Sequence, residues 1–459
     1  MMQDIAKDTI FAVATPPGNG GIGVIRISGP GTRNISTQVL GFQPEARHAH
    51  MAHFQDAHGE TIDTGLALFF PAPRSLTGED VLELQGHGGA VVLKLLADRL
   101  SALGARAARP GEFLERAYLN DKIDLTQAEA IADLIESGTE AAARAARRSM
   151  EGVFSDRVQA LQGQLTTLRV FVEAALDFPD EDIDFIADSD VDERLESVLA
   201  GADELIEQAH QGHLLRDGIT IAIFGQPNAG KSSLLNALSG RDSAIVTDIP
   251  GTTRDVLRET LQLRGYPVHI ADTAGIRDAT DAVEAEGVKR ARHALSEADL
   301  ALLVIDSQAP VAPQQALVSE VPEGIDIIEA INKIDLAAVD WAETERTDAR
   351  EAGGSRNRRV PISARTGEGL EELISTVLTH AGAQSVGHGS FSARTRHVEA
   401  LKRTRDHLRQ GREQLTGFSA AETLAEELRL AQRALGEITG EFLPDDLLGA
   451  IFADFCIGK

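Results

Sequence analysis

A glycine-rich segment between an apolar run and a helical run carries the clearest chemistry in the chain. It reads GQPNAGKS from Gly225 to Ser232, follows the strand-like Ile219 to Phe224 and precedes the helical Ser233 to Leu238. Its glycines let backbone N–H groups close around phosphate, and the helix N-terminus adds the positive end of its dipole. Lys231 reaches the β- and γ-phosphates, and Ser232 offers Mg²⁺ a hydroxyl. The pattern predicts a phosphate loop.

Two later segments predict recognition of guanine. Asn332-Lys333-Ile334-Asp335 follows an apolar strand, and the carboxylate of Asp335 can accept hydrogen bonds from both guanine N1 and the exocyclic amine. Adenine offers no such pair of donors. Ser363-Ala364-Arg365 follows the strand-like Arg359 to Ile362 and is expected to close over the base with backbone N–H groups. The order of these motifs favours GTP over ATP.

Two segments between these motifs are expected to sense the γ-phosphate. Asp272-Thr273-Ala274-Gly275 ends the apolar Val268 to Ile270, which places a carboxylate near Mg²⁺ and a glycine N–H near the γ-phosphate. Thr252 and Thr253 precede it in a switch-like segment, and we assign Thr253, with Ser232, to Mg²⁺. Ile276 stands where many small GTPases carry the glutamine that orients water, so hydrolysis needs another group. The predicted GTP-binding residues are Asn228, Ala229, Gly230, Lys231, Ser232, Ser233, Thr247, Asp248, Ile249, Pro250, Gly251, Thr252, Thr253, Asp272, Thr273, Ala274, Gly275, Asn332, Lys333, Asp335, Ser363, Ala364 and Arg365.

Composition bounds the class of protein that can position these motifs. A chain of 459 residues predicts two to four domains, and 42% hydrophobic residues argue against wholesale disorder. The net charge of −27 repels polyanions, so any contact with nucleic acid must be local or shared with a partner. A single cysteine, no signal peptide and no apolar run near 20 residues indicate a cytoplasmic protein without a membrane span.

Three kinds of sequence pattern along the chain predict a multidomain fold. Strand-like runs (Ile10 to Ala14, Val24 to Ile27, Leu66 to Phe70) and a helix near Ala90 to Leu103 indicate an α+β N-terminal domain over residues 1–121. Helical spacing predicts an all-α domain in two parts, residues 122–216 and 382–459. Alternating strands and helices over residues 217–381 predict an α/β P-loop GTPase domain inserted between those parts.

Further motifs resemble the bacterial MnmE family of tRNA-modification GTPases, also called TrmE, from end to end. The quoted segments are Asp8-Thr9-Ile10, Ala14-Thr15-Pro16-Pro17-Gly18, Leu84-Gln85-Gly86-His87-Gly88-Gly89, Arg109-Pro110-Gly111-Glu112-Phe113, Leu119-Asn120-Asp121-Lys122 and Phe455-Cys456-Ile457-Gly458-Lys459.

The resemblance implies a mechanism of hydrolysis and a set of partners. It implies potassium-dependent hydrolysis, with K⁺ held by Asn228, Thr247, Ile249 and Thr252 between two GTPase domains that meet across their nucleotides, and with Glu284 as the catalytic residue that orients water. It also implies a homodimer formed through the N-terminal domain, and a heterotetramer with the FAD-dependent MnmG protein. By this resemblance, this chain and MnmG together would add an aminomethyl or carboxymethylaminomethyl group at C5 of the wobble uridine of certain tRNAs.

By the same resemblance, the N-terminal domain binds 5-formyltetrahydrofolate or a related tetrahydrofolate. The matching residues are Arg26, Glu83, Lys122 and Lys459. Their chemistry is suitable, because cations can meet the carboxylates of a glutamate tail and a carboxylate can accept from a pterin ring.

Other residues admit plain structural interpretations. Gly18 to Gly23 fits a dinucleotide pattern, yet the next run is β-like, so we favour a turn. His87 has no second ligand at metal spacing and is expected to be a loop histidine. Cys456 is more often a structural or substrate-lining thiol than a nucleophile. The acidic run from Asp177 to Asp184 predicts an exposed interhelical loop.

The basic stretch from Arg394 to Arg412 could follow tRNA phosphates, although a solvated helix face is the plainer interpretation. Two other functions compete with tRNA modification: a GTP-driven factor that assembles ribosomal RNA, and a switch that only recruits effectors. The end-to-end resemblance selects tRNA modification, and no KH-type GXXG module is apparent in the sequence.

Overall fold

The computed structural model describes residues 8–177, 190–240, 259–271, 295–310, 316–322, 324–336, 357–383, 389–418, 421–453, 455 and 458. The chain forms two compact units. The first comprises residues 1–132, 149–200 and 403–459, and the second comprises residues 133–148 and 201–402. In the described part of the chain, no helix is both long and apolar enough to cross a bilayer.

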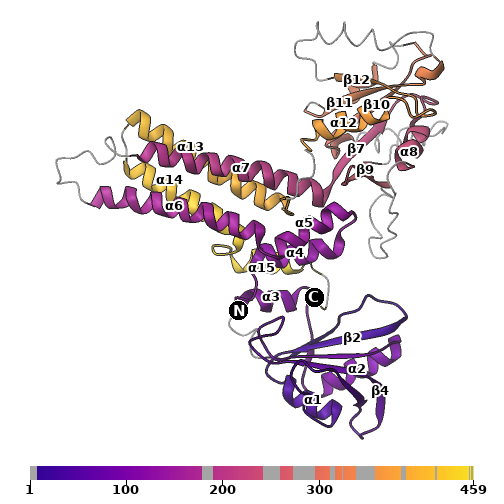
Figure 1. Cartoon of the computed structure of the whole chain (residues 1–459), viewed down its shortest axis with the longest axis vertical. Coiled ribbons are helices and arrows are strands. Elements are labelled where there is room, and N and C mark those ends of the chain that lie inside the picture. Colours follow the sequence, from indigo (N-terminus) through magenta and orange to yellow (C-terminus); the bar gives the residue numbers. More distant parts are fainter. Residues whose placement is uncertain are drawn as a thin grey trace. The chain divides into compact units, whose positions relative to one another are not determined.

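The N-terminal part of the first unit is a six-stranded sheet with the order β3-β4-β5-β2-β1-β6. Helices α1 (Thr32–Leu40) and α2 (Ala90–Ala102) pack on one face, where leucine and isoleucine side chains of both helices and of alternate strand positions form a core. Figure 1 labels α1, α2, β2 and β4 of this region. The strands are β1 (Ile10–Val13), β2 (Gly20–Ser28), β3 (His50–Gln55), β4 (Thr61–Phe70), β5 (Val81–Gly88) and β6 (Arg106–Ala107). The α+β prediction is confirmed, and the predicted helix near Ala90 to Leu103 is α2.

Two interpretations of this region need correction. Strand β2 begins at Gly20, so only Gly18 and Asn19 of the segment predicted as a turn lie outside the strand, and its ladder with β5 shifts register between Gly20 and Gly23. His87 lies on β5 and not in a loop. Sequence patterns missed both because glycines weaken the alternation by which a strand is recognised.

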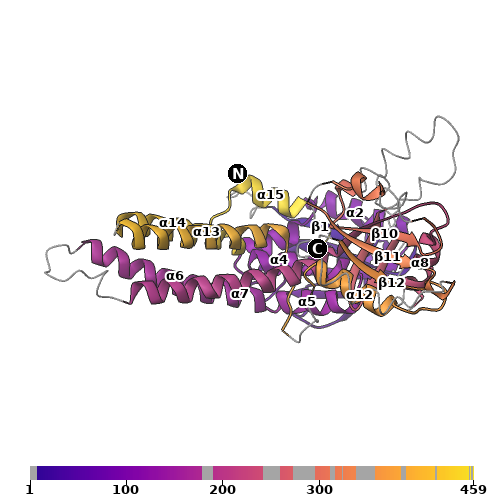
Figure 2. The ribbon, with the colours of Figure 1, turned by 90° about the horizontal axis from the view of Figure 1, so that it is seen from above.

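Helices form the rest of the first unit and the flanks of the second. α6 and α14 lie side by side in Figures 1 and 2. The predicted periodic residues Leu424, Leu428, Ala431, Leu435 and Ile438 are all fully buried, which confirms the helical prediction after the inserted domain. The helices are α3 (Glu112–Leu119), α4 (Leu125–Glu136), α5 (Glu140–Met150), α6 (Val153–Asp177), α7 (Val191–Asp217), α13 (Thr395–Phe418), α14 (Ala421–Thr439) and α15 (Asp445–Ala453).

The second unit contains a six-stranded sheet with the order β12-β11-β10-β7-β9-β8. Neighbours pair in parallel except β8, which forms an antiparallel hairpin with β9. The strands are β7 (Ile219–Phe224), β8 (Glu259–Leu263), β9 (Tyr266–Ala271), β10 (Leu300–Asp306), β11 (Asp326–Asn332) and β12 (Asn357–Pro361). The helices are α8 (Lys231–Ser239), α12 (Leu370–His380) and the 3₁₀ turns Ala316–Glu320 and Ile334–Leu336.

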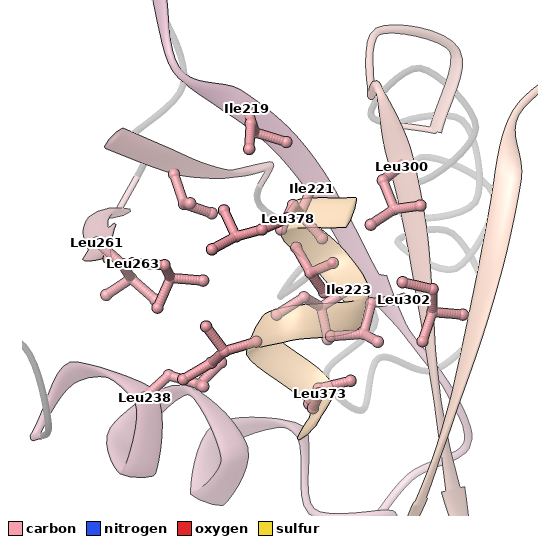
Figure 3. Close-up of a cluster of buried hydrophobic side chains, with 14 of the residues drawn as sticks. Ile219, Ile221, Ile223, Leu238, Leu261, Leu263, Leu300, Leu302, Leu373 and Leu378 are labelled. Carbon is pink, nitrogen blue, oxygen red and sulfur yellow. The ribbon is translucent and has the colours of Figure 1, made fainter. Parts of the chain in front are cut away.

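Branched side chains from this sheet pack against α8 and α12, as Figure 3 shows for Ile221, Leu302, Leu238 and Leu373. The predicted α/β domain is therefore confirmed. The sequence missed β8, a short edge strand next to a segment outside the described residues.

Candidate nucleotide site

The order of the second sheet predicts where a ligand binds. β7 precedes both of its neighbours in the chain: the chain passes from β7 to β8 and β9 on one side, and then crosses to β10 on the other side of β7. In open parallel sheets, ligands bind beyond the carboxyl ends of the strands at such a switch point. The residue that follows β7 is Gly225, the first residue of the predicted phosphate loop.

The loop has the backbone conformations that its residue types allow. Gly225 and Gly230 both have positive φ, 149° and 98°, and an added Cβ would collide with Val304 O at the first and with the Asn332 side-chain amide at the second. Asn228 has a φ of 64°, which asparagine tolerates better than most residues. Gly230 is the N-cap of α8, so the backbone N–H groups that follow it point into the loop.

Lys231 folds back over this loop. Its Nζ donates hydrogen bonds to the carbonyls of Gly225 at 2.8 Å and Gln226 at 2.9 Å. Burial lowers the pKa of its ammonium group. The lysine thus lies among carbonyl acceptors within the loop, where phosphate oxygens could replace them.

Asn332, which ends β11, joins two of the predicted motifs. Its Nδ2 donates to Ala229 O at 2.9 Å, and its Oδ1 accepts from Ala364 N at 3.0 Å. The next residue, Lys333, donates from Nζ to Asn228 O at 2.7 Å. The phosphate loop, Asn332–Asp335 and Ser363–Arg365 are therefore brought together.

Asp335 is exposed, and its orientation is set by a neighbour. The buried Ser363 donates from Oγ to Asp335 Oδ1 at 2.8 Å, and the same Oγ accepts from Thr366 N at 3.1 Å. Within the described part of the chain, this leaves Oδ2 and the second lone pair of Oδ1 for a ligand. A carboxylate held in this way can accept two hydrogen bonds from one edge of a base.

One site residue was missed from the sequence. Asp306, the last residue of β10, accepts a hydrogen bond from Lys333 Nζ at 2.6 Å, and this contact lowers the pKa of the carboxyl against the opposing effect of burial. Its position directly after the apolar Leu300 to Ile305 was the available signal, because polar residues at the carboxyl ends of parallel strands line ligand sites.

Several predicted residues lie outside the described part of the chain. For the nucleotide site these are Thr247 to Thr253, Asp272 to Gly275 and Glu284. For the N-terminal site they are Lys459 and Cys456. Asp177 ends α6, and the rest of the acidic run, up to Asp184, also lies outside the described residues.

In the first unit, Arg26 and Glu83 are paired across β2 and β5, on the face of the sheet opposite α1 and α2. Arg26 Nε donates to Glu83 Oε1 at 3.0 Å, and Nη1 donates to Gly458 O at 3.2 Å. Both side chains are only about one-fifth exposed. Lys122 is exposed and lies against Gly78. His87 Nδ1 contacts Asp63 Oδ1 at 2.7 Å, and among the described residues no group of three or more His, Cys, Asp or Glu side chains could hold a metal.

The basic stretch from Arg394 to Arg412 is largely neutralised by the chain itself. Arg394 pairs with Asp133, Arg403 with Glu437, Arg405 with Asp406, and Arg412 with Asp192 and Glu196. Because these arginines already have carboxylate partners, the structure favours the solvated helix face over a track for phosphates.

The sheet order, the loop after β7, the Asn332 bridge between Ala229 and Ala364, and the placement of Asp335 by Ser363 define a P-loop GTPase. A model of the MnmE helical domain matches residues 125–456, and a model of the GTP-binding protein TrmE N-terminus matches residues 9–122. The tRNA modification GTPase MnmE of Methylococcus capsulatus is 54% identical over 453 residues, and that of Pseudomonas aeruginosa strain UCBPP-PA14 is 54% identical over 459 residues, each over 99% of both chains. The chain belongs to the MnmE family of tRNA modification GTPases, and it is a GTP hydrolase.

Among solved structures, the G domain of the T. maritima FeoB iron transporter is 31% identical, covers 36% of this chain and 98% of that chain, and has a TM-score of 0.27.

Proposed function

We propose that this GTPase acts in the cytoplasm with the FAD-dependent MnmG protein on the wobble uridine of certain tRNAs. It would install the aminomethyl or carboxymethylaminomethyl group at C5 with a tetrahydrofolate one-carbon donor, as a homodimer within a heterotetramer. Membership of the MnmE family at 54% identity over 99% of both chains is the observation that carries this proposal.

The described residues suit the cofactors of the nucleotide site. Lys231 and the N-terminus of α8 provide positive charge for the phosphates of GTP, and the Ser232 hydroxyl lies in the first turn of that helix, where it can bind Mg²⁺. Asp335 and Ser363 would select guanine. Thr253 and Asp272 would complete the magnesium and γ-phosphate contacts.

K⁺ would be held beside the phosphates and offset negative charge near the leaving oxygen. Asn228 contributes an amide oxygen from a loop position whose positive φ is compatible with asparagine. Thr247, Ile249 and Thr252 would supply the other oxygens. Glu284 would orient the attacking water, the role that Ile276 cannot fill.

The Arg26–Glu83 pair fits a folate ligand. It lies on the sheet face opposite α1 and α2, over the ring of Phe113, and it presents a cation and a carboxylate next to the Gly458 carbonyl. Arg26, Lys122 and Lys459 would bind carboxylates of the glutamate tail, and Glu83 would accept from the pterin ring. Cys456, two residues before Gly458, would line the same site.

Nucleoside analysis of tRNA tests the proposal as a whole. A strain that lacks this gene should lose the modified wobble uridine, and the intact chain should restore it when measured by mass spectrometry. Arg26→Ala should fail to restore it while retaining GTP hydrolysis, whereas Glu284→Ala should lose hydrolysis and keep GTP binding. Unchanged wobble uridine in the deletion strain would exclude the proposed function.

A further inference from the structure

The turn of the β8–β9 hairpin is held by helices that flank the GTPase sheet. Thr139, which precedes α5, donates from Oγ1 to Gly265 O in the turn at 3.0 Å. The Tyr266 hydroxyl, at the start of β9, donates to Oε1 of Gln211 on α7, also at 3.0 Å. Thr139 and Tyr266 are both buried. We call residues 133–148 and 201–217 the helical base.

A third hydrogen bond lies further along β9, next to a buried charge cluster. His269 donates from Nε2 to the carbonyl of Asp217, the last residue of α7, at 3.0 Å. Behind it, the buried Asp133 accepts from Arg216 at 2.7 Å and Arg394 at 2.8 Å, and a polar cavity of about 220 Å³ adjoins both His269 and Asp217. The ion pairs hold the base firmly, while the cavity has room for water beside the hairpin.

The hairpin is the edge of its sheet. Among the described strands, β8 is outermost, and β9 joins the others only through its ladder with Ile219–Ala222 of β7. An edge hairpin has fewer ladder hydrogen bonds to break than an inner strand when it shifts. The contacts of the hairpin outside the sheet therefore contribute strongly to its position.

The hairpin also connects the two predicted γ-phosphate sensors in the sequence. The segment with Thr252 and Thr253 precedes β8, and Asp272 follows the last residue of β9 directly. A strand rises about 3.3 Å per residue, so the six residues of β9 span roughly 20 Å. Because a strand moves largely as a unit, a displacement at Asp272 reaches Tyr266 and the turn.

We propose that the β8–β9 hairpin couples the nucleotide state to the helical base through its contacts with Thr139, Gln211 and Asp217. This inference rests on the nucleotide site proposed above and adds a route by which that site reaches the helices. Coupling of this kind is reciprocal, so loosening these contacts must change the preference of the site between nucleotides.

Hydrogen exchange of the full chain tests the coupling. Mg²⁺ with a non-hydrolysable GTP analogue should change exchange in the phosphate loop (residues 225–233) and, relative to GDP, in the helical base. In a Thr139→Val/Tyr266→Phe variant the loop response should persist, and the response of the base should fall by about half or more. The ratio of affinities for the analogue and GDP should shift about 2- to 12-fold for each hydrogen bond lost.

Two further variants separate coupling from simple destabilisation. Thr139 Oγ1 also accepts from Ala142 N and caps α5, so Tyr266→Phe alone loosens the hairpin while it leaves that cap intact. Glu371→Gln breaks the ion pair from α12 to Arg264 in the same turn, without touching the helical base, and should respond as the parent does.

Contrary results have distinct meanings. A base response of parental size in the double variant, or no base response in the parent despite a loop response, would overturn the coupling. No response in either place would overturn the nucleotide site, and the coupling with it.

Discussion

Asn332 donates a hydrogen bond from Nδ2 to the carbonyl of Ala229 at 2.9 Å, which ties the end of β11 to the phosphate loop. The same side chain accepts from Ala364 N. Asn332→Ala should leave two polar backbone groups without this partner, at a cost of about 1–3 kcal/mol in the free energy of unfolding. Guanine-nucleotide affinity should fall as well. Thr379→Ala, at an exposed position of α12, is the control, and calorimetry with nucleotide titration measures both quantities. Equal affinity in Asn332→Ala and the parent would show that the bridge does not order the site.

Guanine specificity should depend on Asp335. Asp335→Asn keeps a group that Ser363 can contact but replaces one acceptor with a donor, so it cannot accept from both guanine donors. Affinity for GDP should fall and affinity for xanthosine diphosphate should rise. Ser363→Ala serves as the comparison, because it frees the carboxylate without changing its chemistry and should weaken GDP only modestly. Competition titrations decide the matter, and unaltered GDP binding by Asp335→Asn would refute the assignment.

Nucleotide affinity should depend on pH through Lys231. Burial lowers the pKa of this ammonium group, and only its protonated form attracts phosphate. The contribution is therefore complete at low pH and is lost as pH rises through the lowered pKa, below the usual range for lysine. GDP affinity measured from about pH 8 to about pH 10 should decline. Guanosine, which has no phosphate, should show a smaller dependence, and equal slopes for the two ligands would exclude Lys231 as the cause.

Hydrolysis should be faster in potassium than in sodium. Asn228→Gly removes the amide oxygen while it allows the positive φ of this residue, so it separates cation binding from backbone strain. We expect the hydrolysis rate of the parent to fall on the order of 10²-fold when K⁺ is replaced by Na⁺. The rate of the Asn228→Gly variant should change little between the two salts. Steady-state rates in matched buffers measure this. Equal rates of the parent in the two salts would remove the cation mechanism.

Two glutamates on α3 should respond oppositely to pH. Burial acts against the charge of Glu112, yet its hydrogen bond from Arg106 lowers the pKa, whereas burial raises the pKa of Glu115 despite Arg109. The contribution of Glu112 to stability should be present above its unfolded pKa and lost as pH falls through its folded pKa. Glu115 should cost stability as pH rises above its unfolded pKa.

Calorimetry of Glu112→Gln and Glu115→Gln checks both signs. At neutral pH, Glu112→Gln should cost about 1.5–3 kcal/mol, because it removes a fully buried carboxylate that pairs with Arg106 and Arg116. The cost is limited because both arginines keep Asp8 as a partner and Arg116 also keeps Glu79. Glu115→Gln should cost much less, and its effect relative to the parent should become less favourable in acid. Matching losses from the two variants would contradict the assignment of the shifts.

The sequence predicted those parts of the site that are local in the chain. The loop after β7 and the Asn332–Asp335 segment each contain their own strand end, glycine or carboxylate, so spacing alone was informative. It did not predict the Asp306–Lys333 contact, the burial of Asn332 between two loops or the hydrogen bonds of Tyr266 and Thr139. Those depend on which strands become neighbours, and pairs distant in the chain leave no periodic signal. His87 was misplaced for a related reason, because the glycines beside it obscure the strand.

The hydrogen bond from Arg26 to Gly458 joins residues that are 432 positions apart. At typical rates of synthesis, roughly 20–90 s pass between the appearance of the arginine and that of the glycine on the ribosome. The sheet that carries Arg26 has its own core and can fold within this interval. Until the tail is made, Arg26 has the Phe113 ring of α3 beneath it, 5.8 Å from its guanidinium, but lacks the Gly458 carbonyl. The proposed folate site would thus become complete only after the GTPase domain has been made.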